Sequence, residues 1–275
     1  MYVIIITQKV RGIFMKIVVC IKQVPDTFEV KIDPETKRIV REGVESIINP
    51  YDNYAIEEAV RLKERFGGTV TAITMGPPQA EKALRDAIAM GVDDAVLLSD
   101  VKFAGSDTLA TSYILSCGIR KIGDFDVIVC GRETLDGSTG QVGPEIAYHL
   151  NIPYITYVSK IKNISDGVME CARLMEDHYE EIKVHLPVLI TVVKEINQPR
   201  IPSLKGMLKA KKAQINVWKC DNIEGEVSCY GQDGSPTRVV DVWTEHMKKE
   251  GKKVEGDTEK LVDTLIEELK KLGVL

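Results

Sequence analysis

Residues 126–150, DVIVCGRETLDGSTGQVGPEIAYHL, decide the fold of this chain. An apolar run at 126–130 has the length of a buried strand, and a glycine-rich loop, GRETLDGSTGQVGP (131–144), follows it directly. From about Gln141 onward the pattern is helical. A strand, a loop and a helix in this order are typical of parallel α/β sheets, in which ligands bind beyond the carboxyl ends of the strands. We therefore expect an α/β protein with a ligand site at this loop.

Composition narrows the functional class. The 275 residues are 44% hydrophobic and 28% charged, which is ordinary for a globular protein, and the formal net charge of −5 provides no basic surface for a nucleic acid. No run approaches the roughly 18 consecutive apolar residues of a membrane-spanning helix, and no signal-peptide cleavage site is recognisable. We expect no nucleic-acid partner, no membrane insertion and a cytoplasmic location. The six cysteines lack CxxC spacing and the four histidines lack ligand spacing, so we expect no disulfide framework and no metal site.

Strand-length apolar runs alternate with helical patterns in the first half of the chain. The helices begin at Asn49-Pro50, near Ala80 and at Ser106-Asp107, and the runs that alternate with them are 16–22, 69–74, 94–99 and 126–130. This β-α-β-α-β-α-β order predicts a doubly wound, mostly parallel sheet. We also expect an inserted hairpin at 31–40. Residues 1–14 are either a dispensable extension or an extra edge strand.

The pattern changes after Leu150. Strand-like runs separated by turn residues predict an antiparallel addition to the same sheet, at 154–161, 168–174, 179–184 and 188–193. Residues 213–256 have a weak pattern, and 258–272 form an amphipathic helix with an apolar stripe suited to docking. We therefore divide the chain into an N-terminal extension (1–14), a nucleotide-binding α/β domain (15–212) and a C-terminal arm (213–275).

The loops that follow the predicted strands would meet at one edge of the sheet. In the 131–144 loop, glycines allow a close approach of the backbone to a ligand, and Ser138 or Thr139 could cap the next helix, whose N-terminus suits a phosphate. Asp136 could accept a hydrogen bond from a ribose. Gly76-Pro77 would leave a backbone edge open for an adenine ring. Each of these features also occurs as an ordinary turn or cap without a ligand.

Several catalytic and nucleotide motifs are absent. The sequence has no GxxxxGK[ST] loop, no GxGxxG after the first strand and no GxSxG nucleophile elbow. No acid–base or Cys/His couple stands out at catalytic spacing, so we assign no catalytic residue. The sequence therefore favours a binding module, or redox chemistry that a bound cofactor supplies.

Longer motifs carry a family resemblance. They are VVCIKQVPD (18–26), INPYDNYAIEEAVRLKE (48–64), TMGPPQAEKALRDAIAMG (74–91), GRETLDGSTGQVGP (131–144), LPVLITV (186–192) and EINQPRIPSLKGMLKAKK (195–212). Together they closely resemble the β (small) subunit of electron transfer flavoproteins, from Met15 to about Lys212 and again in the C-terminal helix.

This resemblance implies an adenine-nucleotide α-hydrolase-like sheet and a heterodimer with a larger α subunit that carries FAD. Electrons would pass between this pair and a flavoprotein dehydrogenase. The β subunit of the family holds either AMP or a second FAD, and the second FAD takes electrons from NADH and divides them between two acceptors. Taking the loops and the resemblance together, the candidate cofactor-binding residues are Cys20, Lys22, Asn49, Asp52, Met75, Gly76, Asp107, Thr108, Gly131, Thr134, Asp136, Gly137, Ser138, Thr139, Gly140 and Gln141.

The loop itself bears on the choice of nucleotide. Residues 136–144, DGSTGQVGP, resemble the DGDTAQVGP of the bifurcating branch more than the longer, more acidic loop ending in NQTGQ of the AMP branch. Ser138 replaces the usual Asp and Gly140 the usual Ala. We expect FAD, with AMP as the alternative. By the same resemblance, Leu204 on the segment 199–204 matches the leucine that anchors a partner dehydrogenase; alternatively, it packs in the protein's own core.

Two other classes of nucleotide-binding protein fit less well. Adenylating or nucleotide-cleaving relatives need an SGG-type phosphate loop after the first strand, where this chain has Lys22-Gln23-Val24. A stand-alone nucleotide sensor of the universal-stress type would not need residues 151–275.

Overall fold

A computed structural model describes residues 14–26, 46–240, 251 and 253–275. The described residues fall into two compact units, one containing 14–26 and 46–240 and the other containing 251 and 253–275. The predicted hairpin at 31–40 and the extension before residue 14 lie outside the described residues. Among those that are described, no helix is both long and apolar enough to cross a membrane.

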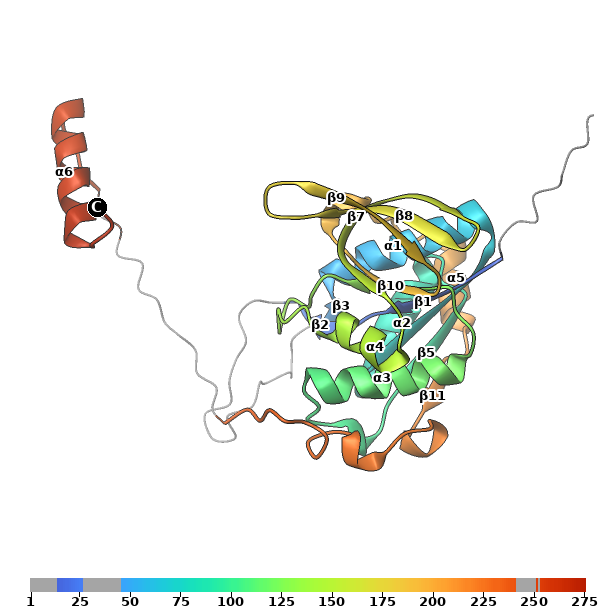
Figure 1. Cartoon of the computed structure of the whole chain (residues 1–275). Coiled ribbons are helices and arrows are strands. Elements are labelled where there is room, and N and C mark those ends of the chain that lie inside the picture. Colours follow the sequence, from blue (N-terminus) through green and yellow to red (C-terminus); the bar gives the residue numbers. More distant parts are fainter. Residues whose placement is uncertain (1–13, 27–45, 241–250, 252) are drawn as a thin grey trace, which may run out of the picture. The chain divides into compact units, whose positions relative to one another are not determined.

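The first unit is built on a nine-stranded sheet with the strand order β11-β5-β4-β1-β6-β10-β7-β8-β9 (Figure 1). Its central four strands are parallel and confirm the predicted runs: β1 (Met15–Cys20), β4 (Gly68–Met75), β5 (Asp94–Leu98) and β6 (Val127–Gly131). The chain runs outward from β1 through β4 to β5 and then returns to β6 on the other side of β1. The carboxyl ends of β1 and β6 therefore form the switch point at which such sheets bind ligands.

Helices cover both faces of this sheet. Alternate residues of β1 point to opposite faces, so Ile17 and Val19 pack with α1 (Pro50–Phe66) and α2 (Glu81–Met90). Val18 and Cys20 pack with the helices of the other face, which are α3 (Thr108–Ile122) and α4 (Val142–Leu150). One apolar cluster lies on each face of the sheet. The strands are mostly apolar because both faces of each strand are buried.

Local signals at the ends of these helices agree with the sequence in most cases, although within the described residues Asn49 makes no side-chain capping hydrogen bond at the start of α1. Pro50 occupies the first turn of α1 after Asn49, and Gly67, with φ of 77°, ends that helix in a conformation that glycine favours. Asp107 caps α3 by accepting a hydrogen bond from the backbone N–H of Ala110. These ends fix where the loops at the carboxyl edge of the sheet begin and finish.

The second half of the sheet differs from the prediction. Its strands are β7 (Tyr154–Ser165), β8 (Val168–Leu174), β9 (Tyr179–His185) and β10 (Val188–Val192). The expectation of four antiparallel strands is wrong for β10, which lies between β6 and β7 and is parallel to both. Only β8 against β7 and β9 against β8 are antiparallel. Every residue of β10 is buried, which is the environment of a central parallel strand.

Residues after 193 add short elements to the same unit. A 3₁₀ helix, η3 (Lys194–Ile196), precedes α5 (Leu204–Lys212), and β11 (Asn216–Trp218) pairs in parallel with β5 at the sheet edge. Two short 3₁₀ helices follow, η4 (Cys220–Asn222) and η5 (Val227–Cys229), and η1 (Pro78–Ala80) and η2 (Val101–Phe103) occur earlier in the chain. The weak pattern after residue 213 did not predict these contacts, and the unit continues to residue 240.

A small sheet and a C-terminal helix lie outside the nine-stranded sheet. A separate two-stranded antiparallel sheet joins β2 (Gln23–Pro25) to β3 (Ser46–Ile48), directly before α1. In the second unit, α6 (Thr258–Lys271) is the predicted amphipathic helix, and Asp257 caps it through a hydrogen bond from the N–H of Lys260. None of the residues of α6 is buried.

Candidate functional site

The loop between β6 and α4 lies at the switch point of the sheet. Ser138 and Gly140 adopt left-handed backbone conformations, with φ of 50° and 63°, and the carbonyl of Thr134 accepts a hydrogen bond from the N–H of Ser138 at 2.8 Å. The tip of the loop, from Gly137 to Thr139, is exposed. The predicted loop thus contains an exposed turn, and its role as a ligand site stays a prediction.

α4 starts where the sequence predicts, near Gln141, but its predicted cap is wrong. Ser138 and Thr139 do not cap it, because the helix begins at Val142 with Gln141 as its N-cap residue. Within the part of the chain that the structure describes, Gln141 makes no side-chain capping hydrogen bond. A helix N-terminus without a side-chain cap keeps backbone N–H groups and the positive end of the helix dipole available for an anion.

Asn49 supports the loop from inside the protein. Its side chain is fully buried (0% exposed), and its Nδ2 donates to the carbonyl of Glu133 at 2.8 Å. Its Oδ1 accepts from the N–H of Leu135 at 3.0 Å. The sequence predicted a polar group at this helix start, whereas the structure places its side chain against the loop backbone.

Asp52 is buried next to Asn49, with 4% of its surface exposed. Its Oδ1 accepts from Asn49 Nδ2 at 3.0 Å and its Oδ2 from the backbone N–H of Lys22 at 2.7 Å. Burial raises the pKa of Asp52 from 3.8 to about 7, although these hydrogen bonds favour the charged form. A Cβ atom on Gly131 would lie 2.3 Å from Asp52 Oδ1, so this close approach requires a glycine.

Lys22, which follows β1, contacts the exposed side of the 131–144 loop. Its Nζ lies 2.8 Å from both carboxylate oxygens of Asp136. Burial alone would raise the pKa of Asp136, but the hydrogen bond and the charge of Lys22 hold it below its usual value. Asp136 is therefore ionised and neutralised by Lys22. This pairing reduces the repulsion that a phosphate near the loop would otherwise meet.

The remaining predicted residues lie at the ends of β1 and β4 and at the start of α3. Cys20 is register partner to Cys130 on β6, and both thiols are buried at the carboxyl ends of their strands. The hydrogen bond that the Cys130 thiol makes to Cys20, together with burial, raises the pKa of Cys130. Met75 ends β4 and Gly76 follows it, where the N–H of Gly76 donates to the carbonyl of Leu98 at 3.0 Å.

Asp107 and Thr108 bring the start of α3 to the start of α4. Thr108 Oγ1 lies 3.3 Å from Gln141 Oε1 and 3.2 Å from Glu145 Oε1. Asp107 already accepts the N–H and the hydroxyl of Thr237, at 3.1 and 2.8 Å, in addition to capping α3. The carboxylate of Asp107 is therefore occupied by protein donors. Sequence reasoning missed Thr237, because it lies in the segment of weak pattern.

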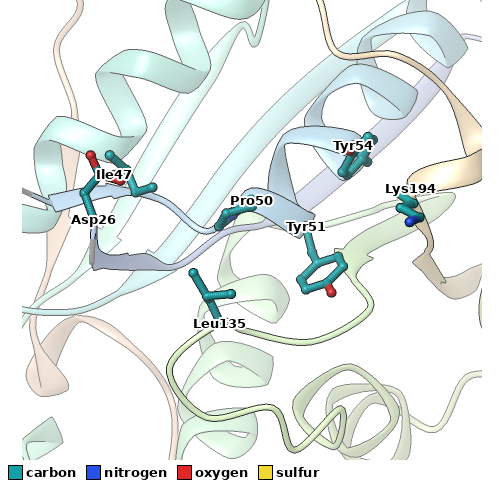
Figure 2. Close-up of a pocket in the computed structure, with 7 residues that line it drawn as sticks. All are labelled: Asp26, Ile47, Pro50, Tyr51, Tyr54, Leu135 and Lys194. Atoms are coloured by element: carbon teal, nitrogen blue, oxygen red, sulfur yellow. The ribbon is translucent and has the colours of Figure 1, made fainter. Parts of the chain in front are cut away.

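A pocket adjoins the loop at Leu135 and was not predicted. Its volume is about 380 Å³, and Figure 2 shows its lining residues, which are Asp26, Ile47, Pro50, Tyr51, Tyr54, Leu135 and Lys194. Tyr51 and Tyr54 are three positions apart in the first turns of α1 and thus share one face of that helix, a spacing that could have indicated an aromatic wall. The guanidinium of Arg132 lies 5.3 Å from the ring centre of Tyr51.

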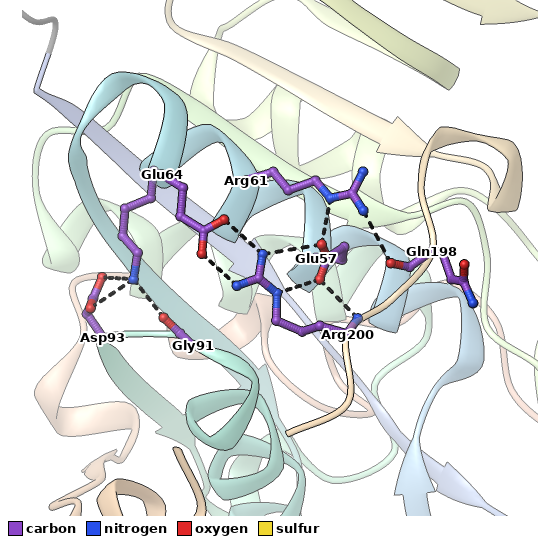
Figure 3. Close-up of polar contacts among 8 residues, drawn as sticks. Glu57, Arg61, Glu64, Gly91, Asp93, Gln198 and Arg200 are labelled. Atoms are coloured by element: carbon purple, nitrogen blue, oxygen red, sulfur yellow. Dashed lines mark hydrogen bonds and ion pairs between the residues drawn. The ribbon is translucent and has the colours of Figure 1, made fainter. Parts of the chain in front are cut away.

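The predicted partner-binding segment lies on the protein surface. Leu204 is the first residue of α5 and is 71% exposed, so the alternative that it packs in the protein's own core is wrong. Arg200 fixes the preceding backbone to α1 (Figure 3). Its Nε lies 2.7 Å from Glu57 Oε2, and its Nη1 lies 2.6 Å from Glu64 Oε1.

The sequence is similar to proteins of one known family along most of its length. A family model described as "Electron transfer flavoprotein domain" matches residues 36–222. The "Electron transfer flavoprotein subunit beta" of Thermoanaerobacterium thermosaccharolyticum is 48% identical over 262 residues, which cover 95% of this chain and 100% of the relative.

Two further relatives have other names. The "Caffeyl-CoA reductase-Etf complex subunit CarD" of Acetobacterium woodii is 45% identical, with 95% of this chain and 100% of the relative covered. "Protein FixA" of Azotobacter vinelandii is 46% identical, with 83% of this chain and 84% of the relative covered.

Proposed function

Because the chain belongs to the electron transfer flavoprotein family, as a relative of its β subunits, we propose that it holds FAD at the 131–144 loop and takes part in electron bifurcation. The observation that supports FAD most is the juxtaposition of two features. The N-terminus of α4 has no side-chain cap from Gln141, which suits a phosphate, and an aromatic pocket of about 380 Å³ adjoins the same loop at Leu135.

The two candidate nucleotides differ in what they need. AMP requires an adenosine site and one phosphate site, whereas FAD also requires room for a second, flat ring system. Tyr51, Tyr54 and Leu135 provide apolar and aromatic surface of the kind that lines cofactor pockets. Lys194 adds a positive charge at the edge of the pocket. The pocket therefore supports FAD over AMP.

Bound FAD would supply the redox chemistry, and the residues of this chain would bind and orient it. The backbone N–H groups at the start of α4 and around Gly137 would hold the phosphates. Lys22 keeps the charge of Asp136 compensated beside them. Asn49 and Asp52 hold the loop from below. The tyrosine wall would exclude water from one side of the ring.

The family also suggests the partners. We propose that residues 15–212 bind the nucleotide and that the arm with α6 docks on a larger α subunit, which carries another FAD. NADH is the proposed electron donor. The name of the Acetobacterium woodii relative places that protein in a complex with a reductase, which supports a flavoprotein dehydrogenase as the further partner here.

Counting cofactors tests the choice of nucleotide. The α–β complex would be purified, its nucleotides released with acid, and flavin and AMP quantified by chromatography and absorbance. Two FAD per heterodimer are expected. One FAD and one AMP per heterodimer would refute FAD in this subunit, while leaving its place in the family intact.

The partner role of Leu204 needs a separate test. Because this side chain is 71% exposed, Leu204→Ala should leave folding and nucleotide content unchanged. It should slow electron transfer between the heterodimer and the dehydrogenase that accepts its electrons, since buried apolar anchors carry much of the energy of an interface. Unchanged transfer would remove this role from Leu204.

A further inference from the structure

The side chain of Asn49 is fully engaged with the protein. Its Nδ2 donates to Glu133 O at 2.8 Å and to Asp52 Oδ1 at 3.0 Å, and its Oδ1 accepts from Leu135 N at 3.0 Å. A side-chain amide has two N–H donors, and both are used here at fixed points of the chain. With 0% of its surface exposed, the side chain faces the loop backbone from the interior.

Asp52 continues the same connection. One of its oxygens accepts from Asn49 and the other from the backbone N–H of Lys22 at 2.7 Å, and the N–H of Gly131 also donates to this carboxylate. The Asn49–Asp52 pair thus joins the end of β1, the first turn of α1 and the loop after β6. These are the three segments that meet at the switch point.

We propose that Asn49 is a positioning residue for nucleotide binding, which sets the backbone of residues 133–135 and is not itself a ligand. The proposal rests on the nucleotide site proposed above. Left-handed residues such as Ser138 cost conformational energy and persist only where their surroundings hold them. The two hydrogen bonds between Asn49 and the backbone of Glu133 and Leu135 hold the residues just before this turn, so on this proposal the loop is held in place before the nucleotide binds.

The chain contains a matched control that contacts the same helix, α1. Asn197 Nδ2 donates to Tyr54 O and to Glu58 Oε2, both at 3.0 Å, and thereby holds the segment before Arg200 to α1. Asn49→Asp and Asn197→Asp therefore make the same chemical change. Each removes a donor to a backbone carbonyl and places a second carboxylate beside an existing one.

The experiment measures dissociation constants of the full chain for FAD and for AMP, together with the thermal midpoint of unfolding. Asn49→Asp should weaken binding by about tenfold or more, because the carbonyl of Glu133 loses its donor. Asn197→Asp should lower the thermal midpoint and weaken binding much less than Asn49→Asp does, because Asn197 contacts the backbone of Tyr54 and not the 131–144 loop. Equal losses of affinity in both variants would overturn the proposal, as would unchanged affinity in Asn49→Asp.

A double variant, Asn49→Asp with Asp52→Asn, covers the case in which the single variant does not fold. It restores the contact between positions 49 and 52 with the donor and acceptor exchanged, so the thermal midpoint should recover. Glu133 O still lacks its donor, so affinity should stay about tenfold below wild type. Wild-type affinity in the folded double variant would overturn the proposal. A wild-type chain that binds neither nucleotide would contradict the proposed function instead.

Discussion

Lys22 and Asp136 form an ion pair across the switch point of the sheet, with 2.8 Å between the Lys22 ammonium and each carboxylate oxygen. Lys22 follows β1, and Asp136 lies in the loop after β6, so 114 positions of sequence separate the partners. This contact closes the outer side of the loop, while Asn49 and Asp52 hold its inner side. The turn at Gly137–Thr139 is thereby supported from both directions.

The ion pair leads to a prediction about affinity. Lys22→Gln leaves the charge of Asp136 uncompensated beside the proposed phosphate position, so FAD and AMP should each bind about tenfold more weakly. Removing both charges, in Lys22→Gln with Asp136→Asn, should recover part of the loss. Titration of each nucleotide into the full chain would measure this. Lys16→Gln is the control, because its partner Asp124 is almost fully exposed, and wild-type affinity in Lys22→Gln would contradict the prediction.

Asp52 leads to a prediction about pH and stability. Its pKa is raised from 3.8 to about 7, so the folded protein binds this proton more tightly than the unfolded chain does. The resulting stabilisation is complete below the unfolded value of 3.8 and is lost as the pH rises through about 7. Wild type should therefore lose stability relative to Asp52→Asn between about pH 5 and pH 7, on the order of 1 kcal/mol per pH unit.

Urea unfolding at a series of pH values would check the prediction for Asp52. The informative quantity is the slope of the difference between the two proteins, because Asp52→Asn also changes hydrogen bonds by a constant amount. Asp166→Asn is a suitable control, since Asp166 is exposed in a turn. Parallel pH profiles for wild type and Asp52→Asn would contradict the assignment.

The sequence predicted the core of the fold because its signals there are local. β1, β4, β5 and β6 are short, mostly apolar runs, and the helices between them end at glycines, while α3 also begins at the side-chain cap Asp107. The pairing of β10 was not predictable in this way. Its apolar run follows three strands joined by turns, which suggests another antiparallel neighbour, whereas it inserts between β6 and β7. β11 has only three residues, and pairing with β5 rather than its own pattern defines it.

The sequence predicted only part of the site, because local signals locate a loop but do not show the contacts that its side chains make. Glycines and polar residues at helix starts identified the edge of the sheet, but a polar residue type does not reveal which way its side chain points. Asn49 and Asp52 point inward, and Asp107 is occupied by Thr237. In the sequence, Tyr51 and Tyr54 are ordinary helix residues. Only the folded structure brings them together with Leu135 and Lys194 to line one pocket.

Two glycines of the loop should respond differently to substitution by alanine. A Cβ on Gly137 would lie 3.3 Å from Thr134 Oγ1, its nearest neighbour, so Gly137→Ala should fold with nearly wild-type stability. The added methyl group would occupy space that a bound phosphate needs, and affinity for FAD should fall. A Cβ on Gly143 would lie 2.8 Å from Thr191 Cγ2, so Gly143→Ala should destabilise the core by about 1–3 kcal/mol.

Chemical unfolding and nucleotide titration would separate the two effects. Loss of affinity with unchanged stability in Gly137→Ala would place a ligand at the tip of the loop. If that variant bound both FAD and AMP with wild-type affinity, the nucleotide would not bind at the tip of this loop.

Arg200 leads to the last prediction, which concerns the segment that presents Leu204. Burial alone would raise the pKa of Glu57, yet hydrogen bonds from Arg200 and Arg61 hold it below its usual value, so Glu57 is a charged group with only 3% of its side chain exposed (Figure 3). Arg200→Gln leaves that charge with the guanidinium of Arg61, at 2.6 Å, and the backbone N–H of residue 200, at 3.1 Å. We expect a loss of roughly 2–4 kcal/mol, slightly below the usual value for breaking a buried pair.

The matched control is Glu64→Gln, which removes the other partner of Arg200. The Glu64 side chain is 54% exposed, so this variant should lose less than about 1 kcal/mol. Urea unfolding gives both values, and the rate of tryptic cleavage after Lys205 reports whether the segment has loosened. Arg200→Gln should speed that cleavage more than Glu64→Gln does, because it removes the guanidinium contacts with both Glu57 and Glu64, whereas Glu64→Gln leaves the contact with Glu57 in place. If the two variants lost equal stability, the exposed contact between Arg200 and Glu64, and not the contact with buried Glu57, would anchor the segment.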